Sequence, residues 1–248
     1  MTWFEALFVL VAGVGAGTIN AVVGSGTLLT FPALLAVGLP PVLANVSNSV
    51  GLSPGTAAGA IGYRRELEGQ RGRLIRLIPA SLVGGIVGAV LLLKLPDTAF
   101  KAVVPGLILL GCVLVALQPW LSKRINLPDH AHRGAWWVIP AVFATGVYGG
   151  YFGAAQGVLL MAILGIGMDA NLQRMNALKN VLATVVNSIA AVLFIIVAHV
   201  DWVAAALLAV GSTIGGFLGA RYGRKLPPVA LRALIVVIGI VAIVTMIF

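Results

Sequence analysis

A lysine stands inside an apolar segment of this chain, and its position is the clearest sign of chemistry in the sequence. Lys179 lies about eight residues, or roughly 12 Å, from the start of the apolar run 171–198. An ammonium group at that depth costs several kcal/mol unless something neutralises it, and all seven carboxylates fall in loops or at the ends of apolar runs. Lys179 is therefore deprotonated, solvated by a cavity or available to an anion. We favour a role in binding an anionic substrate over the alternative that the side chain extends to the lipid headgroups.

Amide side chains accompany this lysine. Asn176, Asn180 and Asn187 are spaced i, i+4 and i+11, so they share one helical face. Amide groups on that face can donate hydrogen bonds to oxyanions without adding charge. In the first half of the chain, Ser47 and Asn48 form a similar cluster, and an offset of 129 residues aligns Ser47 with Asn176. Ordinary hydrogen bonds between helices are the competing explanation for these polar residues.

Two glycine-rich breaks interrupt apolar stretches, at NAVVGSGT (20–27) and at GGYFGAAQG (149–157). A helix that begins at Gly26 or Gly157 would direct unbonded backbone N–H groups and its positive dipole end at the membrane centre. Two such ends together with Lys179 would form an anion site, although close backbone packing also demands glycine. The substrate contacts predicted at the breaks are Gly24, Ser25, Gly26, Gly153, Gln156 and Gly157.

These candidates sit in a chain of 248 residues that is 60% hydrophobic and only 9% charged, with a mean hydropathy of +1.08. Soluble domains carry about 25% charged residues, so this is an integral membrane protein. Apolar runs that approach or exceed the roughly 20 residues needed to span a bilayer occur at about 3–37, 41–62, 74–93, 99–120, 135–168, 171–198, 201–220 and 229–248. We predict an all-α polytopic fold without a soluble domain.

The runs 3–37 and 135–168 are too long for one crossing and carry the two glycine breaks. Each is predicted to be two helical pieces that meet at a loop inside the membrane, where irregular backbone is tolerated only under cover of protein or beside a cavity. A re-entrant hairpin and two short crossings both fit this pattern. Pro54 predicts a further break in the run 41–62.

The basic residues indicate how the chain is oriented. If each broken stretch starts and ends on one side, thirteen of the 16 Lys and Arg fall on one side, near 64–76, 123–133, 174 and 221–232. The other side then holds only Lys94 and Lys101. The positive-inside rule makes the crowded side cytoplasmic, so both termini are predicted to be extracytoplasmic. The net charge of +9 is accordingly assigned to anionic lipid headgroups on the cytoplasmic side, not to nucleic acid.

The two halves of the chain resemble each other. GGIVGAVLLLKLP (84–96) and GGFLGARYGRKLP (215–227) share seven of thirteen positions, and Gly17, Gly24 and Gly38 align with Gly146, Gly153 and Gly167. Because each half changes sides an odd number of times, the halves would form two inverted repeats, an architecture of transporters. Each repeat is a broken or re-entrant helix pair plus three transmembrane helices. The predicted units are a first repeat at 1–120, a cytoplasmic linker at 121–134 and a second repeat at 135–248.

Over essentially its whole length the chain resembles the sulfite exporter TauE/SafE family of membrane permeases. The resemblance rests on VVGSGTLLTFPALLAVGLPP (22–41), GVYGGYFGAAQGVLLMAILGIG (146–167), Tyr63-Arg64-Arg65, HVDW (199–202) and GGFLGAR followed by KLPP. It implies a multi-pass protein of the bacterial inner membrane that transports sulfur-containing anions such as sulfite or organosulfonates, or other small anions.

An exporter or uniporter for small anions is the leading interpretation, because an anion that leaves an interior-negative cell gains roughly 2.3 kcal/mol per charge per 100 mV without a coupling ion. An anion channel and a non-transporting scaffold are the alternatives. An enzyme is not expected, because the GxSxG match at Ser53 lies in an apolar helix and the three histidines lie in loops. No cofactor or metal is predicted, the single Cys112 excludes an internal disulfide, and a homodimer is left open.

Overall fold

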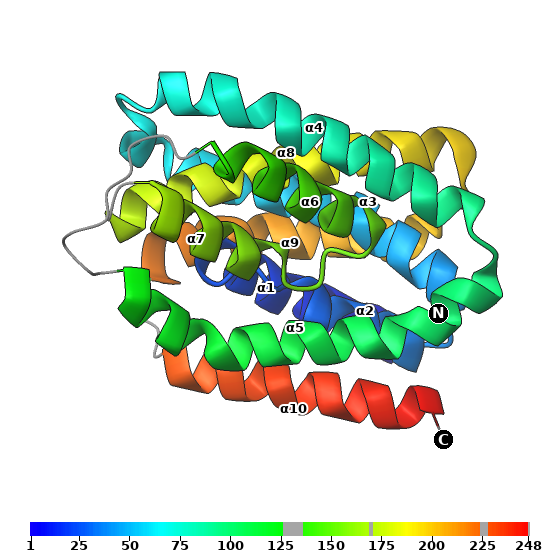
Figure 1. Ribbon diagram of the computed structural model, residues 1–248. Helices are drawn as coiled ribbons and strands as arrows, with labels where there is room; N and C mark the ends of the chain where they lie inside the picture. Colours follow the sequence, from blue (N-terminus) through cyan, green and yellow to red (C-terminus); the bar gives the residue numbers. More distant parts are fainter. Residues whose placement is uncertain (126–135, 169–170, 224–227, 248) are drawn as a thin grey trace.

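The computed structural model describes residues 1–125, 136–168, 171–223 and 228–247, and every regular element among them is a helix (Figure 1). The first half of the chain contains α1 (Trp3–Val22), α2 (Thr27–Ala36), α3 (Pro41–Gly62), the short 3-10 helix η1 (Arg64–Leu67), α4 (Arg71–Lys94) and α5 (Asp97–Ile125). The second half contains α6 (Val138–Tyr151), α7 (Gln156–Gly167), α8 (Leu172–Val197), α9 (Trp202–Tyr222) and α10 (Pro228–Ile247). The helices coincide with the predicted apolar runs.

Five of the described helices are long and apolar enough to cross a membrane, namely α1, α4, α5, α8 and α9. The prediction of an all-α polytopic membrane protein is therefore confirmed. Most of the predicted linker, together with Arg224 and Lys225, lies outside the described residues. The repeat boundaries and the inverted relation of the two halves stay predictions.

Both broken stretches fold back on themselves. We call α1 and α2 the first hairpin, joined by the first break (residues 23–26), and α6 and α7 the second hairpin, joined by the second break (residues 152–155). Phe8 of α1 and Ala36 of α2 line the same groove. A side chain at Gly167, the end of α7, would meet Val138 at the start of α6. Each second helix returns to the end of the bundle where the first began, an arrangement that a re-entrant hairpin and two short crossings share, so both alternatives stay open.

Glycines set the packing of the hairpins against the long helices. α1 packs on α9 and α6 packs on α4, while α3 contacts both α8 and α9. A side chain at Gly215 or Gly219 would overlap α1 backbone, and one at Gly84 or Gly88 would overlap α6 backbone. The GGxxG pattern therefore has the same role in both halves. In each half it lets a long helix pack closely against the hairpin of the other half.

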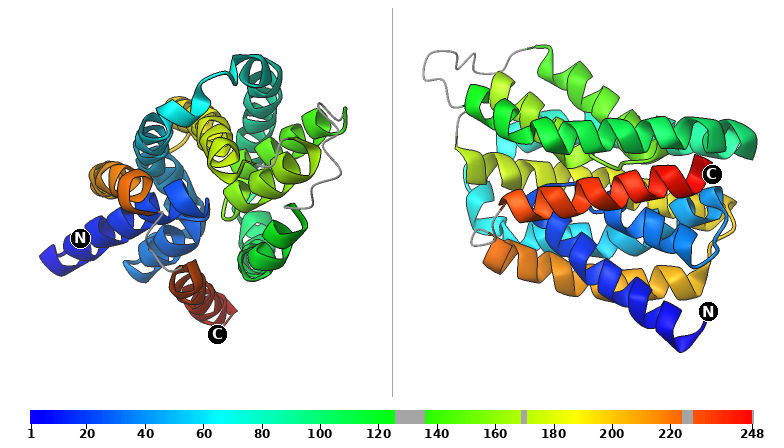
Figure 2. Two further views of the ribbon diagram at one scale, coloured as in Figure 1. Left: turned by 90° about the vertical axis from the view of Figure 1, so that its left-hand side faces the viewer. Right: turned by 90° about the horizontal axis from the view of Figure 1, so that it is seen from below.

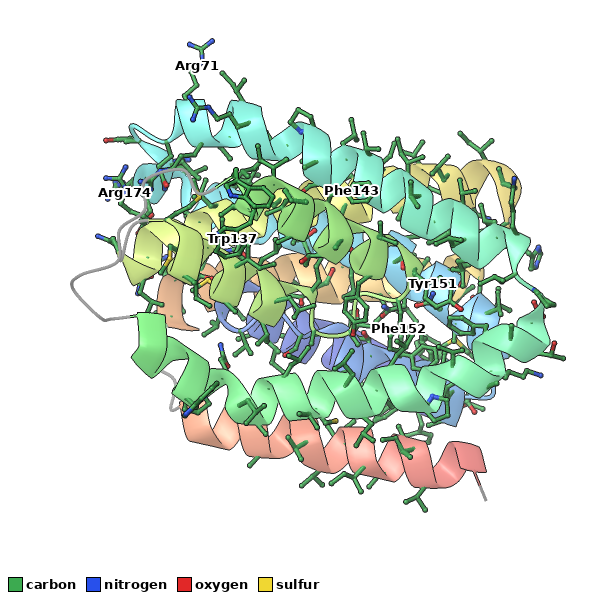
Figure 3. All side chains as sticks on the ribbon, viewed as in Figure 1. Arg71, Trp137, Phe143, Tyr151, Phe152 and Arg174 are labelled. Carbon is green, nitrogen blue, oxygen red and sulfur yellow. The ribbon has the colours of Figure 1, made fainter. Side chains whose placement is uncertain are left out.

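The ends of the bundle differ in charge. Arg71 and Arg174 lie at one end (Figure 3), whereas both chain termini lie at the other (Figure 1).

The prediction of a break at Pro54 is wrong, because α3 continues as one helix from Pro41 to Gly62. One missing backbone hydrogen bond is outweighed here by the packing of α3 between α8 and α9.

Candidate functional site

The two breaks touch at the centre of the bundle. The backbone N–H of Gly157, in the first turn of α7, donates to the carbonyl of Gly24 over 2.9 Å. A methyl group on either glycine would overlap the backbone of the other. Phe31 of α2 packs edge-on against Phe152 of the second break, with ring centroids 5.1 Å apart. Sequences far apart in the chain therefore meet at one point.

The expectation of an unbonded N–H at Gly157 is wrong, because that group is committed to Gly24. At the first break, the N–H of Gly26 donates to Oδ1 of Asn20 over 2.7 Å. Gly24 and Gly153 have φ values of +87° and +73°, which turn the chain sharply after each first helix. The glycines at the breaks therefore provide turns and close approach.

Lys179 lies at the end of α1. Its ammonium donates to the carbonyls of Asn20 (3.0 Å) and Ala21 (3.2 Å), and the residue is fully buried. The amides of Asn176 and Asn180 also donate to the carbonyl of Ala21, over 3.2 and 3.3 Å. These donors satisfy carbonyls at the negative end of the α1 dipole. The alternative that Lys179 reaches the lipid headgroups is thereby excluded.

The second hairpin is capped in a related way but without a charge. Asn45 of α3 donates through Nδ2 to the carbonyl of Tyr151, the last residue of α6, over 2.9 Å. Figure 3 shows Tyr151 and Phe152 at the end of α6 opposite Trp137. A helix of one half thus caps the broken helix of the other half at both breaks. Lysine occurs at only one of the two caps.

A small polar cavity of about 20 Å³ lies between the breaks. A water molecule needs at least about 10–15 Å³, so the cavity has room for about one water and none for a sulfonate. The lining residues come from the ends of both hairpins and from α3 and α8: Asn20, Gly24, Thr27, Thr56, Gly153, Gln156, Gly157, Lys179, Asn180, Ala183 and Asn187. This conformation is closed around its centre.

A protonated Lys179 has no local counter-charge. No carboxylate pairs with it among the residues that the structure describes, and its two acceptors are neutral carbonyls. An ammonium has three donors, so two are used and one remains for the cavity that Lys179 lines. Near it, Nε2 of Gln156 and Oγ of Ser25 are buried and have no hydrogen-bond partner.

The structure brings most of the predicted site residues together. Six of them line the cavity: Gly24, Gly153, Gln156, Gly157, Lys179 and Asn180. Gly26 and Asn176 lie beside it through their hydrogen bonds with Asn20 and Ala21, and Ser25 stands between Gly24 and Gly26 in the first break. Asn48 does not line the cavity. Its side chain donates to the hydroxyl of Thr27 over 3.3 Å and accepts from the hydroxyl of Thr30, and so fixes the start of α2.

Ser47 is the exception. Its hydroxyl accepts the N–H of Asp201 over 2.9 Å and thus holds the connection between α8 and α9. The offset of 129 residues aligns Ser47 with Asn176, but the two side chains have different partners, since Asn176 donates to the carbonyl of Ala21. The candidates chosen from the sequence did not include Asn20, Thr27 or Thr56, which also line the cavity. The signal for them was weak, namely a polar side chain within an apolar run.

Comparison with known proteins gives a consistent result. The family model described as "Sulfite exporter TauE/SafE" matches residues 9–246. A "Probable membrane transporter protein ORF9" of a Sinorhizobium species is 26% identical over 94% of this chain and 88% of its own length. The "Probable membrane transporter protein YfcA" of Escherichia coli is 28% identical over 85% and 76% of the two chains. A "Probable membrane transporter protein" of Haemophilus influenzae is 23% identical over 95% and 92%. No solved structure matches the chain significantly.

Proposed function

Because the chain belongs to the sulfite exporter TauE/SafE family of membrane transporters, we propose that it carries small oxyanions, such as sulfite or organosulfonates, through the central cavity. The observation that supports this most is the buried, locally unbalanced ammonium of Lys179 in a cavity lined by polar groups of both hairpins. A buried charge is costly until it is paired. An anion in the cavity would pair it.

The donors at the cavity suit an oxyanion. The remaining N–H of Lys179 supplies charge, and the orphaned Nε2 of Gln156 and Oγ of Ser25 supply neutral hydrogen bonds. Sulfite, sulfonate and carboxylate groups present several acceptor oxygens to such a set. One positive charge balances a monoanion and leaves a dianion half compensated, so we expect organosulfonates to bind better than sulfate.

Binding requires the cavity to open, since it now holds about one water. Thr56 and Asn187 line one wall, and next to them Oγ of Ser53 and Oγ of Ser188 are hydrogen-bonded across α3 and α8 at 3.1 Å. We infer that separation of α3 from α8 at this hydrogen bond opens the cavity. If the halves are inverted repeats, as we propose, rocking of one against the other would expose the site to each side in turn.

We further propose that the protein lies in the bacterial inner membrane with both termini extracytoplasmic, since the charged end of the bundle would then face the cytoplasm. Anionic headgroups would pair with the arginines at that end. Export is the expected direction, because the membrane potential drives an anion outward at roughly 2.3 kcal/mol per charge per 100 mV. An enzymatic role is not part of this proposal.

The test is flux through purified protein in liposomes. Vesicles loaded with labelled sulfite, methanesulfonate, acetate or sulfate are diluted into anion-free buffer, and efflux is followed with wild type, Lys179→Gln and the surface control Lys94→Gln. We expect saturable efflux of at least one monoanion that Lys94→Gln retains and Lys179→Gln loses. Rates equal to those of protein-free vesicles for all four anions, or equal efflux in Lys179→Gln, would contradict the proposal. Flux that never saturates would indicate a channel.

A further inference from the structure

A large apolar groove lies away from the central site. It has a volume of about 880 Å³ and runs between α1, α2 and α10, with Lys101 of α5 at its edge. Figure 2 shows α1 and α10 on either side of α2. Phe8 and Val11 form one wall, Val237 and Val241 form the other, and these four side chains are about half exposed or more.

The groove is lined by exposed apolar side chains and extends along part of α2. Its lining on α2 extends from Ala36 to Leu29, which corresponds to roughly 10 Å of helix rise. Half of a hydrocarbon core is about 15 Å. The groove begins at the end of the bundle that carries the chain termini, because Phe8, Ala36 and Pro41 line it. An acyl chain from the leaflet at that end would match its depth and polarity.

The charge of the groove indicates which kind of lipid would bind there. Among the described residues that line the groove, Lys101 is the one with a charge. It is exposed and forms no ion pair within the described part of the chain. Asp97, one turn earlier on α5, lines a different cavity with His199. The groove thus combines an apolar lining with the positive charge of Lys101, which is the complement of an anionic phospholipid.

We propose that this groove binds an anionic phospholipid, with an acyl chain along α2 and the headgroup phosphate at Lys101. The lipid would supply packing for the outward face of α2, whose N-terminal end forms the first break. This site is separate from the oxyanion cavity, and its occupancy does not depend on what the protein transports. A lipid at this position differs from the headgroups expected at the arginine-rich end of the bundle.

Lipid retention tests the proposal directly. Native mass spectrometry of detergent-purified protein, titrated with phosphatidylglycerol or phosphatidylcholine, reports each bound lipid by its mass. We expect wild type and the control Lys94→Gln to retain phosphatidylglycerol several-fold better than phosphatidylcholine. Lys101→Gln should lose that preference. Val241→Trp, which fills the groove from its exposed wall, should lose the bound lipid, and Val244→Trp on the same helix should keep it.

Other outcomes would overturn the proposal. If Lys101→Gln and Val241→Trp both retain phosphatidylglycerol as wild type does, the lipid is bound elsewhere. If the protein is observed as a lipid-free dimer that Val241→Trp converts to monomers, a second copy of the chain covers the groove instead. Equal retention of both lipids by wild type would remove the role of Lys101.

Discussion

The N–H of Gly157 donates to the carbonyl of Gly24, and this one hydrogen bond joins the two helix breaks at the centre of the protein. Neither residue has room for a side chain, so the contact fixes how closely the hairpins approach. The cavity with Lys179 lies where they meet. The contact of Gly24 with Gly157 therefore holds the two hairpins together beside the cavity.

Gly24→Ala should destabilise the protein much more than Gly38→Ala. Both glycines have nearly the same φ, +87° and +88°, where an L-residue costs about 1–2 kcal/mol. A methyl group at Gly38 meets open space, whereas at Gly24 it overlaps Gly157. Thermal unfolding in detergent would measure both. Equal losses would mean that the hairpins can separate at no cost.

The two helix caps should respond differently to deletion. Asn45→Ala removes the side-chain donor seen at the carbonyl of Tyr151, and an unsatisfied buried carbonyl costs about 1–3 kcal/mol. Asn176→Ala leaves Lys179 and Asn180 on the carbonyl of Ala21, so a loss of roughly 0.5–1 kcal/mol is expected. Denaturant unfolding of the two variants checks the order. The reverse order would show that Lys179 and Asn180 do not compensate for the loss of Asn176 at the carbonyl of Ala21.

Ser47→Ala should leave anion binding intact. Its hydroxyl holds the N–H of Asp201, so its removal loosens the start of α9 and not the cavity. Hydrogen exchange should accelerate at residues 198–204, while the anion concentration needed for half-maximal stabilisation stays within about twofold of wild type. A larger change in anion affinity would return Ser47 to the binding site.

A disulfide between α3 and α8 should lock the transporter. Ser53 and Ser188 are the natural pair, because their Oγ atoms are 3.1 Å apart. In a Cys112→Ala background, Ser53→Cys with Ser188→Cys should lose anion flux on oxidation and regain it on reduction. Each single cysteine variant, treated identically, is the control. Undiminished flux in the oxidised pair would show that the cavity opens elsewhere.

Much of the fold could be predicted because the membrane leaves few choices. The apolar runs predicted the positions of the helices, and the glycine breaks at 20–27 and 149–157 correctly marked where α1 and α6 end. Pro54 failed as a break because packing on both sides of α3 keeps it helical. The sequence shows that Pro54 lacks a backbone N–H donor, but it does not show that α8 and α9 will pack against α3 and compensate for that loss.

The sequence indicated several of the residues that line the cavity, but it did not indicate their hydrogen-bond partners. Lys179 stands out in the sequence because a buried ammonium must be neutralised, yet the groups that contact it are the neutral backbone carbonyls of Asn20 and Ala21. Carbonyls occur at every position, so sequence alone does not identify which ones a side chain will reach. The contact of Ser47 could not be predicted for the same reason, since the N–H of Asp201 leaves no mark in the sequence.

Binding of anions to the purified protein tests the central claim, that Lys179 makes the cavity an anion site. Thermal shifts would be measured across sulfite, sulfate, thiosulfate, sulfoacetate, taurine and acetate for wild type, Lys179→Ala, Lys179→Gln and Lys94→Gln. We predict that at least one anion raises the unfolding temperature of wild type and of Lys94→Gln, and that neither Lys179 variant responds. If folded Lys179→Gln is stabilised as much as wild type, or if no anion stabilises any of these proteins, Lys179 serves only as the cap of α1.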